Sequence, residues 1–276
     1  MAKLTCSVIS YTLLRTVDIT VVIPTVTIPG SMGMDGQKPR HTPEHKFPVL
    51  YLLHGMGNDH SGWTAYTNVE FFAEERNIAV VMISGENKAY IDWEGGDQFY
   101  KFIEEELPDF VCGLFPISDR PEDTYIAGLS MGGYGTLVHA LGAPERYAAF
   151  GAFSAAINMP KISSDMDVDK VMAESAGGAA PAADKKFDRF DPNDLADKIA
   201  ADGKKFPKVY MACGGKDFLL QSNHDFRDKL IGLGADVTYD EIPEYGHEWR
   251  FWNIEVEKFL DWLPRTDPYA GKKRQI

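Results

Sequence analysis

A serine flanked by glycines carries the clearest chemical signal in the sequence. Ser130 lies in Gly128-Leu129-Ser130-Met131-Gly132, directly after an apolar run and directly before a stretch with helical spacing. A serine on a tight turn between a strand and a helix projects its hydroxyl group out of the sheet, and flanking glycines allow the crowded turn. This context indicates a nucleophile that attacks the carbonyl carbon of an acyl group, rather than an incidental serine in a glycine-rich turn.

A serine hydroxyl group is a weak nucleophile, so it needs a general base and an acid that orients this base. Among the seven histidines, His247 is the best candidate for the base, because it follows the last predicted strand and precedes the last predicted helix. It therefore lies at the carboxyl edge of the predicted sheet, as Ser130 does. Asp217 is the first acidic residue after the predicted strand 208–213, whereas the rival Asp225 lies inside the following helix. The order Ser130, Asp217, His247 is the one expected for hydrolases with this turn.

Acyl transfer also needs hydrogen-bond donors for the negative charge that develops on the carbonyl oxygen. The backbone N–H of Met131, the residue after the serine, is one predicted donor. The second is expected from the loop after the apolar run that ends at Leu53, where Met56 is the first choice and Gly57 the second. His54, at the start of this loop, is expected to hold the loop by a hydrogen bond rather than to take part in catalysis.

The elements that must position these residues alternate between strands and helices. Continuous apolar runs are typical of strands that are buried on both faces of a parallel sheet. Such strands alternating with helical patterns predict an α/β fold, with a mostly parallel central sheet and helices on both of its faces. Strands are predicted at 47–53, 78–83, 124–129, 148–155, 208–213 and 237–242, and helices at 68–76, 98–114, 133–141, 222–233 and 250–263.

Other features of the sequence complete this description, and one segment, 157–206, breaks the alternation. Residues 5–27 have β-branched side chains at alternating positions, which predicts two antiparallel strands with a turn near 16–18, and residues 30–46 read as an exposed loop. Pro108 is expected to kink the helix in which it lies. Residues 157–206, with Ser/Asp-rich and Ala/Gly-rich pieces and a helix near their end, are interpreted as a cap insertion within one domain that spans the whole chain.

The composition limits the class of protein and its partners. The 28 basic and 41 acidic residues give a net charge of −13, which disfavours nucleic acid and anionic membranes as partners. No apolar run reaches the roughly 20 residues of a membrane span, so a cytoplasmic protein is expected. The three cysteines, Cys6, Cys112 and Cys213, read as buried thiols in a reducing compartment, and no cluster suggests a metal site. The sequence is compatible with a homo-oligomer.

Taken together, these motifs resemble the esterase family that includes tributyrin esterase, S-formylglutathione hydrolase and the feruloyl and acetyl-xylan esterases. The resemblance extends from Phe47 to Trp262. It is carried, in this order, by Leu52-Leu53-His54-Gly55-Met56-Gly57, by Trp63, by Glu106-Leu107-Pro108, by Gly128-Leu129-Ser130-Met131-Gly132-Gly133-Tyr134-Gly135, by Gly214 to Leu219 and by Gly246-His247.

The resemblance implies the α/β-hydrolase fold and hydrolysis of short-chain acyl esters of acetyl, butyryl or feruloyl type, without a cofactor. It implies that Ser130, Asp217 and His247 form the catalytic triad and that Met56 and Met131 are the oxyanion donors. The ester substrate would be a small molecule. An acyltransferase similar to the mycolyltransferases is the main alternative, and a non-catalytic module and a peptidase are weaker ones. The sequence does not choose the acyl group or the alcohol.

Overall fold

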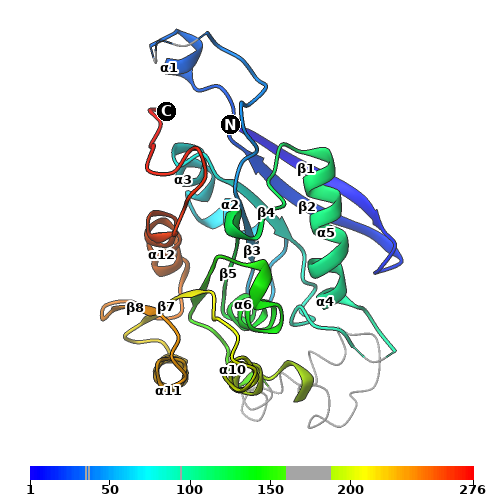
Figure 1. Cartoon of the computed structure of the whole chain (residues 1–276), viewed down its shortest axis with the longest axis vertical. Coiled ribbons are helices and arrows are strands. Elements are labelled where there is room, and N and C mark those ends of the chain that lie inside the picture. Colours follow the sequence, from blue (N-terminus) through cyan, green and yellow to red (C-terminus); the bar gives the residue numbers. More distant parts are fainter. Residues whose placement is uncertain (35, 37, 94, 160–187) are drawn as a thin grey trace.

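Eight strands form one mostly parallel sheet that crosses the molecule (Figure 1). The computed structural model describes residues 1–34, 36, 38–93, 95–159 and 188–276. The strand order is β1-β2-β4-β3-β5-β6-β7-β8; β2 pairs antiparallel with both β1 and β4, and all other pairs are parallel. The strands are β1 Ala2–Ser10, β2 Arg15–Ile23, β3 Val49–Leu53, β4 Ala79–Ile83, β5 Thr124–Leu129, β6 Ala149–Phe153, β7 Lys208–Gly214 and β8 Val237–Ile242.

Helices cover both faces of the sheet, as the sequence predicted. Side chains of β3 alternate between two apolar clusters: Val49 and Leu53 belong to one, and Leu50 and Leu52 to the other. Every residue of β3 is buried, which is why its sequence reads as a continuous apolar run. The first cluster contains residues of α5 Leu107–Leu114, α6 Met131–Gly142, α10 Pro192–Ala201 and α11 Leu220–Gly232, and the second contains residues of α2 Gly62–Tyr66, α3 Val69–Glu75 and α12 Trp249–Trp262.

The helix predicted at 98–114 consists of three segments rather than one kinked helix. A π-helical turn at Phe102–Glu106 lies between α4 Phe99–Lys101 and α5. Pro108 has no N–H to donate to the carbonyl group four residues before it. In this region the Leu107 N–H bonds instead to the carbonyl group of Phe102, five residues back, so the turn widens before the proline. The other short helices among the described residues are α1 Ile28–Ser31, Pro121–Asp123, Pro144–Arg146 and Asp188–Phe190.

The predicted turn near 16–18 was wrong, because these residues lie inside β2. The turn comprises residues 11–14, and Leu14 adopts a positive φ of 53°. The carboxylate of Glu106, 94 or 95 positions away in the sequence, accepts hydrogen bonds from the backbone N–H groups of Tyr11 and Thr12, at 2.9 Å each. A distant side chain therefore holds the turn, and Asp18, within the range predicted for the turn, instead accepts a hydrogen bond from Ser7 on the paired strand β1.

Part of the predicted cap insertion, residues 160–187, lies outside the described residues. Its described end comprises Asp188–Phe190 and α10, which packs against α6; the Tyr134 hydroxyl group donates to the Phe190 carbonyl at 3.0 Å. Cys213 is buried as predicted, but Cys6 on the edge strand and Cys112 beside a surface cavity are only partly buried. Among the described helices, none combines the length and apolar character needed to cross a bilayer.

Candidate functional site

The pairing of the parallel strands brings the predicted site residues to one edge of the sheet. Leu53 pairs with Gly128, and Leu129 pairs with Phe153, so β3, β5 and β6 end side by side. The loop of residues 54–59 follows β3, and Ser130 follows β5. Because parallel strands share their direction, the loops after their carboxyl ends meet at the same edge, where α/β proteins form their sites.

Ser130 lies on a strained turn between β5 and α6. Its φ and ψ angles are 55° and −116°, a backbone conformation that a residue with a side chain rarely adopts. The turn is held from both sides, because the Ser130 N–H donates to the Phe153 carbonyl at 2.9 Å and the Ser130 carbonyl accepts from the Ala156 N–H at 3.1 Å. Such strain persists where the surrounding structure imposes it, and it points the side chain out of the sheet.

The glycines around Ser130 are required for close packing and not for their own backbone angles. Gly128 and Gly132 are absent from the described residues with positive φ. A Cβ atom on Gly132 would overlap the carbonyl oxygen of Leu53 and would lie 2.6 Å from that of His54, and one on Gly128 would overlap the backbone of Gly132. The two glycines therefore allow the turn to press against the end of β3.

The structure brings His247 and Asp217 into direct contact. Nδ1 of His247 lies 2.9 Å from Oδ2 of Asp217, and the other carboxylate oxygen accepts the Leu219 N–H at 2.9 Å. Burial by itself would raise the pKa of the Asp217 carboxyl group, but the hydrogen bond and charge of His247 and the Leu219 N–H outweigh it and hold that pKa below its usual value. The carboxylate thus stays ionised at neutral pH and can orient the imidazole ring.

Ser130 and His247 line the same cavity of about 540 Å³. Met56 and Met131, the two residues predicted to supply oxyanion donors, line it too, whereas Asp217 lies behind His247 and outside the lining. The other lining residues are Gly55, Asn58, Leu129, Ala156, Met159, Phe218, Leu219, Glu248, Trp249 and Trp252. Four of the five predicted site residues therefore face one cavity, and the fifth contacts one of those four.

The backbone around the cavity distinguishes between the two candidate donors on the 54–59 loop. Met131 is the first residue of α6, where an N–H has no partner within the helix. The Gly57 N–H already donates to Oδ1 of Asn87 at 2.7 Å, which disfavours the second choice and favours Met56. The predicted role of His54 in holding this loop is supported by two contacts: Nδ1–H donates to the Gly55 carbonyl at 2.6 Å, and Nε2 accepts the Gly85 N–H at 2.8 Å.

The sequence did not identify the residues that support Asp217 and His247 from behind. The indole N–H of Trp252 donates to the Ser154 hydroxyl group at 3.1 Å, and this hydroxyl group contributes to the lowered pKa of the Asp217 carboxyl group. The ring of Trp252 lies 4.9 Å from that of His247, edge to face, and the exposed ring of Phe218 lies 4.8 Å away on another side. Phe218 follows Asp217 directly in the sequence, and Trp252 lies in the first turns of α12, five residues after His247. Their closeness in sequence to the predicted acid and base was the signal that could have identified them.

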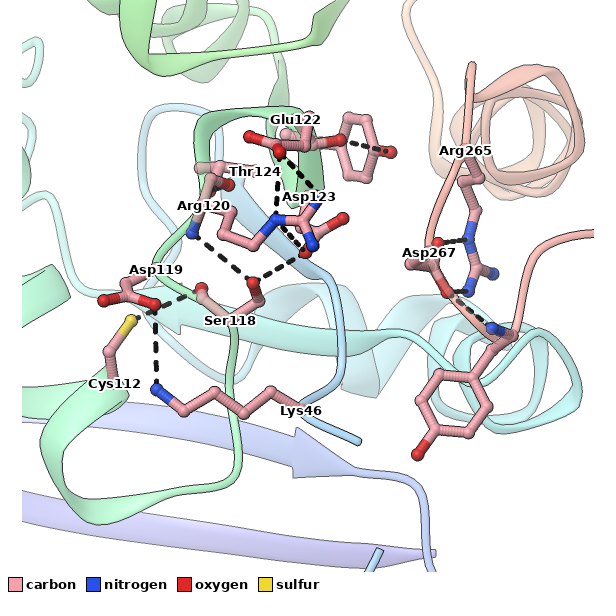
Figure 2. Close-up of polar contacts among 12 residues, drawn as sticks. Lys46, Cys112, Ser118, Asp119, Arg120, Glu122, Asp123, Thr124, Arg265 and Asp267 are labelled. Carbon is pink, nitrogen blue, oxygen red and sulfur yellow. Dashed lines mark hydrogen bonds and ion pairs between the residues drawn. The ribbon is translucent and has the colours of Figure 1, made fainter. Parts of the chain in front are cut away.

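A second cavity, of about 510 Å³, lies near the opposite edge of the sheet, where β5 begins. Figure 2 shows its polar side chains paired with one another: Lys46 lies 3.7 Å from Asp119, and the Ser118 hydroxyl group donates to Asp123 at 2.7 Å. The thiol of Cys112 donates to the Ser118 carbonyl, and burial raises its pKa, which disfavours the reactive thiolate. Nowhere in the described part of the chain do three His, Cys, Asp or Glu side chains gather as metal ligands would.

Comparison with known proteins identifies the family of this chain. The profile of the esterase family, described as "Putative esterase", matches residues 25–255. This chain belongs to that esterase family. It is 33% identical over 228 residues to an acetyl esterase of Caldicellulosiruptor saccharolyticus, covering 79% of this chain and 84% of that protein. The esterase family and the α/β-hydrolase fold that the sequence predicted are confirmed, and the chain is a carboxylic ester hydrolase.

The solved structure of the fluorophosphonate-binding serine hydrolase F of Staphylococcus aureus, with bound substrate, superposes with a TM-score of 0.81. It is 29% identical in sequence, and the match covers 95% of this chain and 98% of that one. The diacylglycerol acyltransferase/mycolyltransferase Ag85A of Mycobacterium leprae is 26% identical, over 87% of this chain and 81% of that protein. The esterase therefore has both hydrolases and acyltransferases among its relatives.

Proposed function

We propose that this esterase is a serine carboxylesterase that hydrolyses short-chain acyl esters through an acyl-enzyme on Ser130. The observation that carries the proposal is one cavity that contains Ser130 and His247, with Asp217 hydrogen-bonded to the far nitrogen of that imidazole. Ser130 attacks the ester carbonyl carbon as Nε2 of His247 takes the hydroxyl proton. Asp217 stabilises the resulting imidazolium, which then gives the proton to the departing alcohol.

The same groups then catalyse hydrolysis of the acyl-enzyme. Water enters from the open side of the cavity, and His247 takes its proton as it attacks the acyl carbon. The tetrahedral intermediate collapses, Ser130 leaves as the hydroxyl group, and a carboxylic acid is the second product. The backbone N–H groups of Met56 and Met131 would stabilise the negatively charged oxygen in both halves of the reaction. Preorganised donors of this kind supply a large part of the rate enhancement in enzymatic acyl transfer.

Two observations support a short, apolar acyl group. The cavity beside Ser130 has apolar walls, with Leu129, Met159 and Trp252 among its lining residues. The curated relative that is 33% identical is named an acetyl esterase. We expect kcat/KM to be highest for acetyl or butyryl esters and to fall for longer chains. A panel of p-nitrophenyl esters, extended to feruloyl, acetyl-sugar and S-formylglutathione esters, measures this.

The central test is the replacement of Ser130. Ser130→Ala should lower kcat for p-nitrophenyl acetate by about 10⁴–10⁶-fold, the scale on which triad serines act. Ser118→Ala, a change to the buried serine beside the second cavity, is the matched control and should keep the wild-type rate. Equal activity in wild type and Ser130→Ala would refute the proposed nucleophile.

Acyl transfer to an alcohol is the second candidate, because the mycolyltransferase Ag85A matches 87% of this chain. The two reactions share the acyl-enzyme and differ in what attacks it. With p-nitrophenyl butyrate and increasing glycerol, a hydrolase releases mainly butyric acid, whereas a transferase forms mainly butyryl glycerol. Chromatography of the products measures this ratio. A product mixture dominated by butyryl glycerol at low glycerol concentration would favour the transferase.

A further inference from the structure

A strained segment lies directly against the 54–59 loop. Residues 84–93, named here the strap, follow β4. The described part of the chain contains eight non-glycine residues with positive φ, and four of them are on the strap: Glu86, Asn87, Ala89 and Tyr90. Left-handed backbone is unfavourable for residues with a side chain, by about 1–2 kcal/mol each. Such a concentration persists only where the surroundings impose it, and it is typical of functional sites.

The strap contacts the 54–59 loop through three hydrogen bonds. The buried hydroxyl group of Tyr90 donates to the His54 carbonyl at 2.8 Å. The Gly85 N–H donates to Nε2 of the buried His54 ring at 2.8 Å, and Oδ1 of Asn87 accepts the Gly57 N–H at 2.7 Å. These contacts flank Met56 on both sides along the chain. The direction of the Met56 N–H therefore depends on the strap.

Tyr90 also contacts the helix that carries the other candidate donor. A Cβ atom on Gly135 would lie 2.6 Å from the Tyr90 ring, so this ring packs directly on the backbone of α6. Met131 is the first residue of the same helix. One buried side chain thus bridges the loop with Met56 and the helix with Met131. This side chain therefore contacts both stretches of backbone that carry the candidate donors.

The strap is itself anchored by buried and charged groups away from the cavity. Nε2 of the fully buried His139, on α6, lies 3.0 Å from the Tyr90 carbonyl. Lys88 pairs with Asp97 and with Glu86, and Arg15 of β2 pairs with the same two acids. The strained conformation is therefore also held by groups that do not belong to the 54–59 loop.

We propose that the strap positions the oxyanion donors of this esterase, with Tyr90 and Asn87 as the positioning residues. The inference rests on the proposed function, in which the N–H groups of Met56 and Met131 bind the oxyanion. Neither Tyr90 nor Asn87 lines the cavity. They act through the backbone that they hold, so their removal should weaken binding of the transition state while binding of the substrate stays the same.

The first experiment uses Tyr90→Phe, which keeps the ring that packs on α6 and removes only the hydroxyl group. We expect kcat for p-nitrophenyl acetate to fall by about tenfold, less than the 10²–10³-fold that follows the loss of a whole oxyanion donor. KM should change by less than about twofold, because only transition-state binding is lost. A trifluoromethyl ketone forms a tetrahedral adduct whose oxygen occupies the same place, and its Ki should rise by about tenfold. Ki does not depend on the fraction of active enzyme, so a folding defect alone would not change it.

The second experiment separates the Asn87 contact from backbone strain. Asn87→Gly removes the acceptor and tolerates positive φ, whereas Asn87→Asp keeps an acceptor and also tolerates it. We expect kcat to fall several-fold in Asn87→Gly and to remain close to wild type in Asn87→Asp. Ala89→Gly is the matched control, because Ala89 lies on the strap with φ of 55° and carries no side-chain acceptor. Its kcat should remain unchanged.

The outcomes separate this inference from the proposed function. Wild-type kcat and Ki in both Tyr90→Phe and Asn87→Gly would overturn the positioning role while Ser130-dependent hydrolysis still stands. An equal loss in Ala89→Gly would overturn it as well, since general loosening of the strap would then explain the effect. A wild type without esterase activity would refute the proposed function itself. A parallel loss of kcat and rise of Ki, absent from Ala89→Gly and Asn87→Asp, is the result expected.

Discussion

Replacing Asp217 by asparagine is the most discriminating perturbation of the proposed triad. The two carboxylate oxygens have different partners: one accepts the Leu219 N–H and the other faces Nδ1 of His247, each at 2.9 Å. The Leu219 N–H is a buried donor that needs an acceptor. In Asp217→Asn, the amide oxygen therefore stays with Leu219, and the amide nitrogen, a donor, faces His247.

This orientation forces the wrong tautomer on the base. Nδ1 of His247 must then accept a hydrogen bond from the amide nitrogen and carry no proton, so the ring bears its proton on Nε2 and cannot take one from Ser130. The carboxylate that stabilises the imidazolium is lost as well. The equivalent change in a serine protease triad lowers kcat by roughly 10⁴-fold. We expect a loss of that order here, which corresponds to about 5.5 kcal/mol in the activation free energy.

The assay is the steady-state hydrolysis of p-nitrophenyl acetate at neutral pH, with the circular dichroism spectrum and thermal midpoint as checks of folding. Asp225→Asn is the matched control, because Asp225 is exposed, lies on α11 and pairs with Gln221 on the same helix. It should keep wild-type kcat. A folded Asp217→Asn with more than a tenth of wild-type kcat would refute the tautomer argument, and a large loss in Asp225→Asn would reassign the acid.

Two further predictions concern stability. Burial alone would raise the pKa of the Glu106 carboxyl group, but hydrogen bonds from Ser10, Tyr11 and Thr12 outweigh it and lower that pKa. The ionised carboxylate therefore stabilises the folded state above the ordinary pKa of 4.5, and this stabilisation is lost as the pH falls through the pKa of Glu106 in the folded protein. Glu106→Gln should lower the free energy of unfolding by about 1–2 kcal/mol at pH 7 in urea titrations, and a difference that persists unchanged at pH 3 would contradict this. Gly132→Ala should lower the free energy of unfolding by about 1–3 kcal/mol, because the new Cβ atom would overlap the backbone of residues 53 and 54. Gly113→Ala, on α5 with nothing within 4 Å of the new Cβ, should be neutral or stabilising, and equal losses in both variants would remove the packing argument.

Much of the fold follows from local patterns in the sequence. Each strand from β3 to β8 lies within about two residues of its predicted range, because burial on both faces requires a continuous apolar run. The N-terminal hairpin was predicted with the wrong turn, since Glu106 holds the actual turn from 94 or 95 residues away. The π-helical turn before Pro108 is also a tertiary outcome, because the proline signals a disruption without specifying its form.

The sequence by itself determined which residues could do chemistry. The sequence shows the glycines around Ser130 and the order of Ser130, Asp217 and His247 at the ends of predicted strands. The shared direction of parallel strands then places these residues at one edge of the sheet. Only the tertiary structure decided how the site is held. Asn87 accepts a hydrogen bond from the Gly57 N–H, and the Tyr90 hydroxyl group donates to the His54 carbonyl. Both hydrogen bonds join segments that are 30 or more residues apart in the sequence. No local pattern encodes such contacts, because they exist only once the strands have paired and brought the strap against the loop.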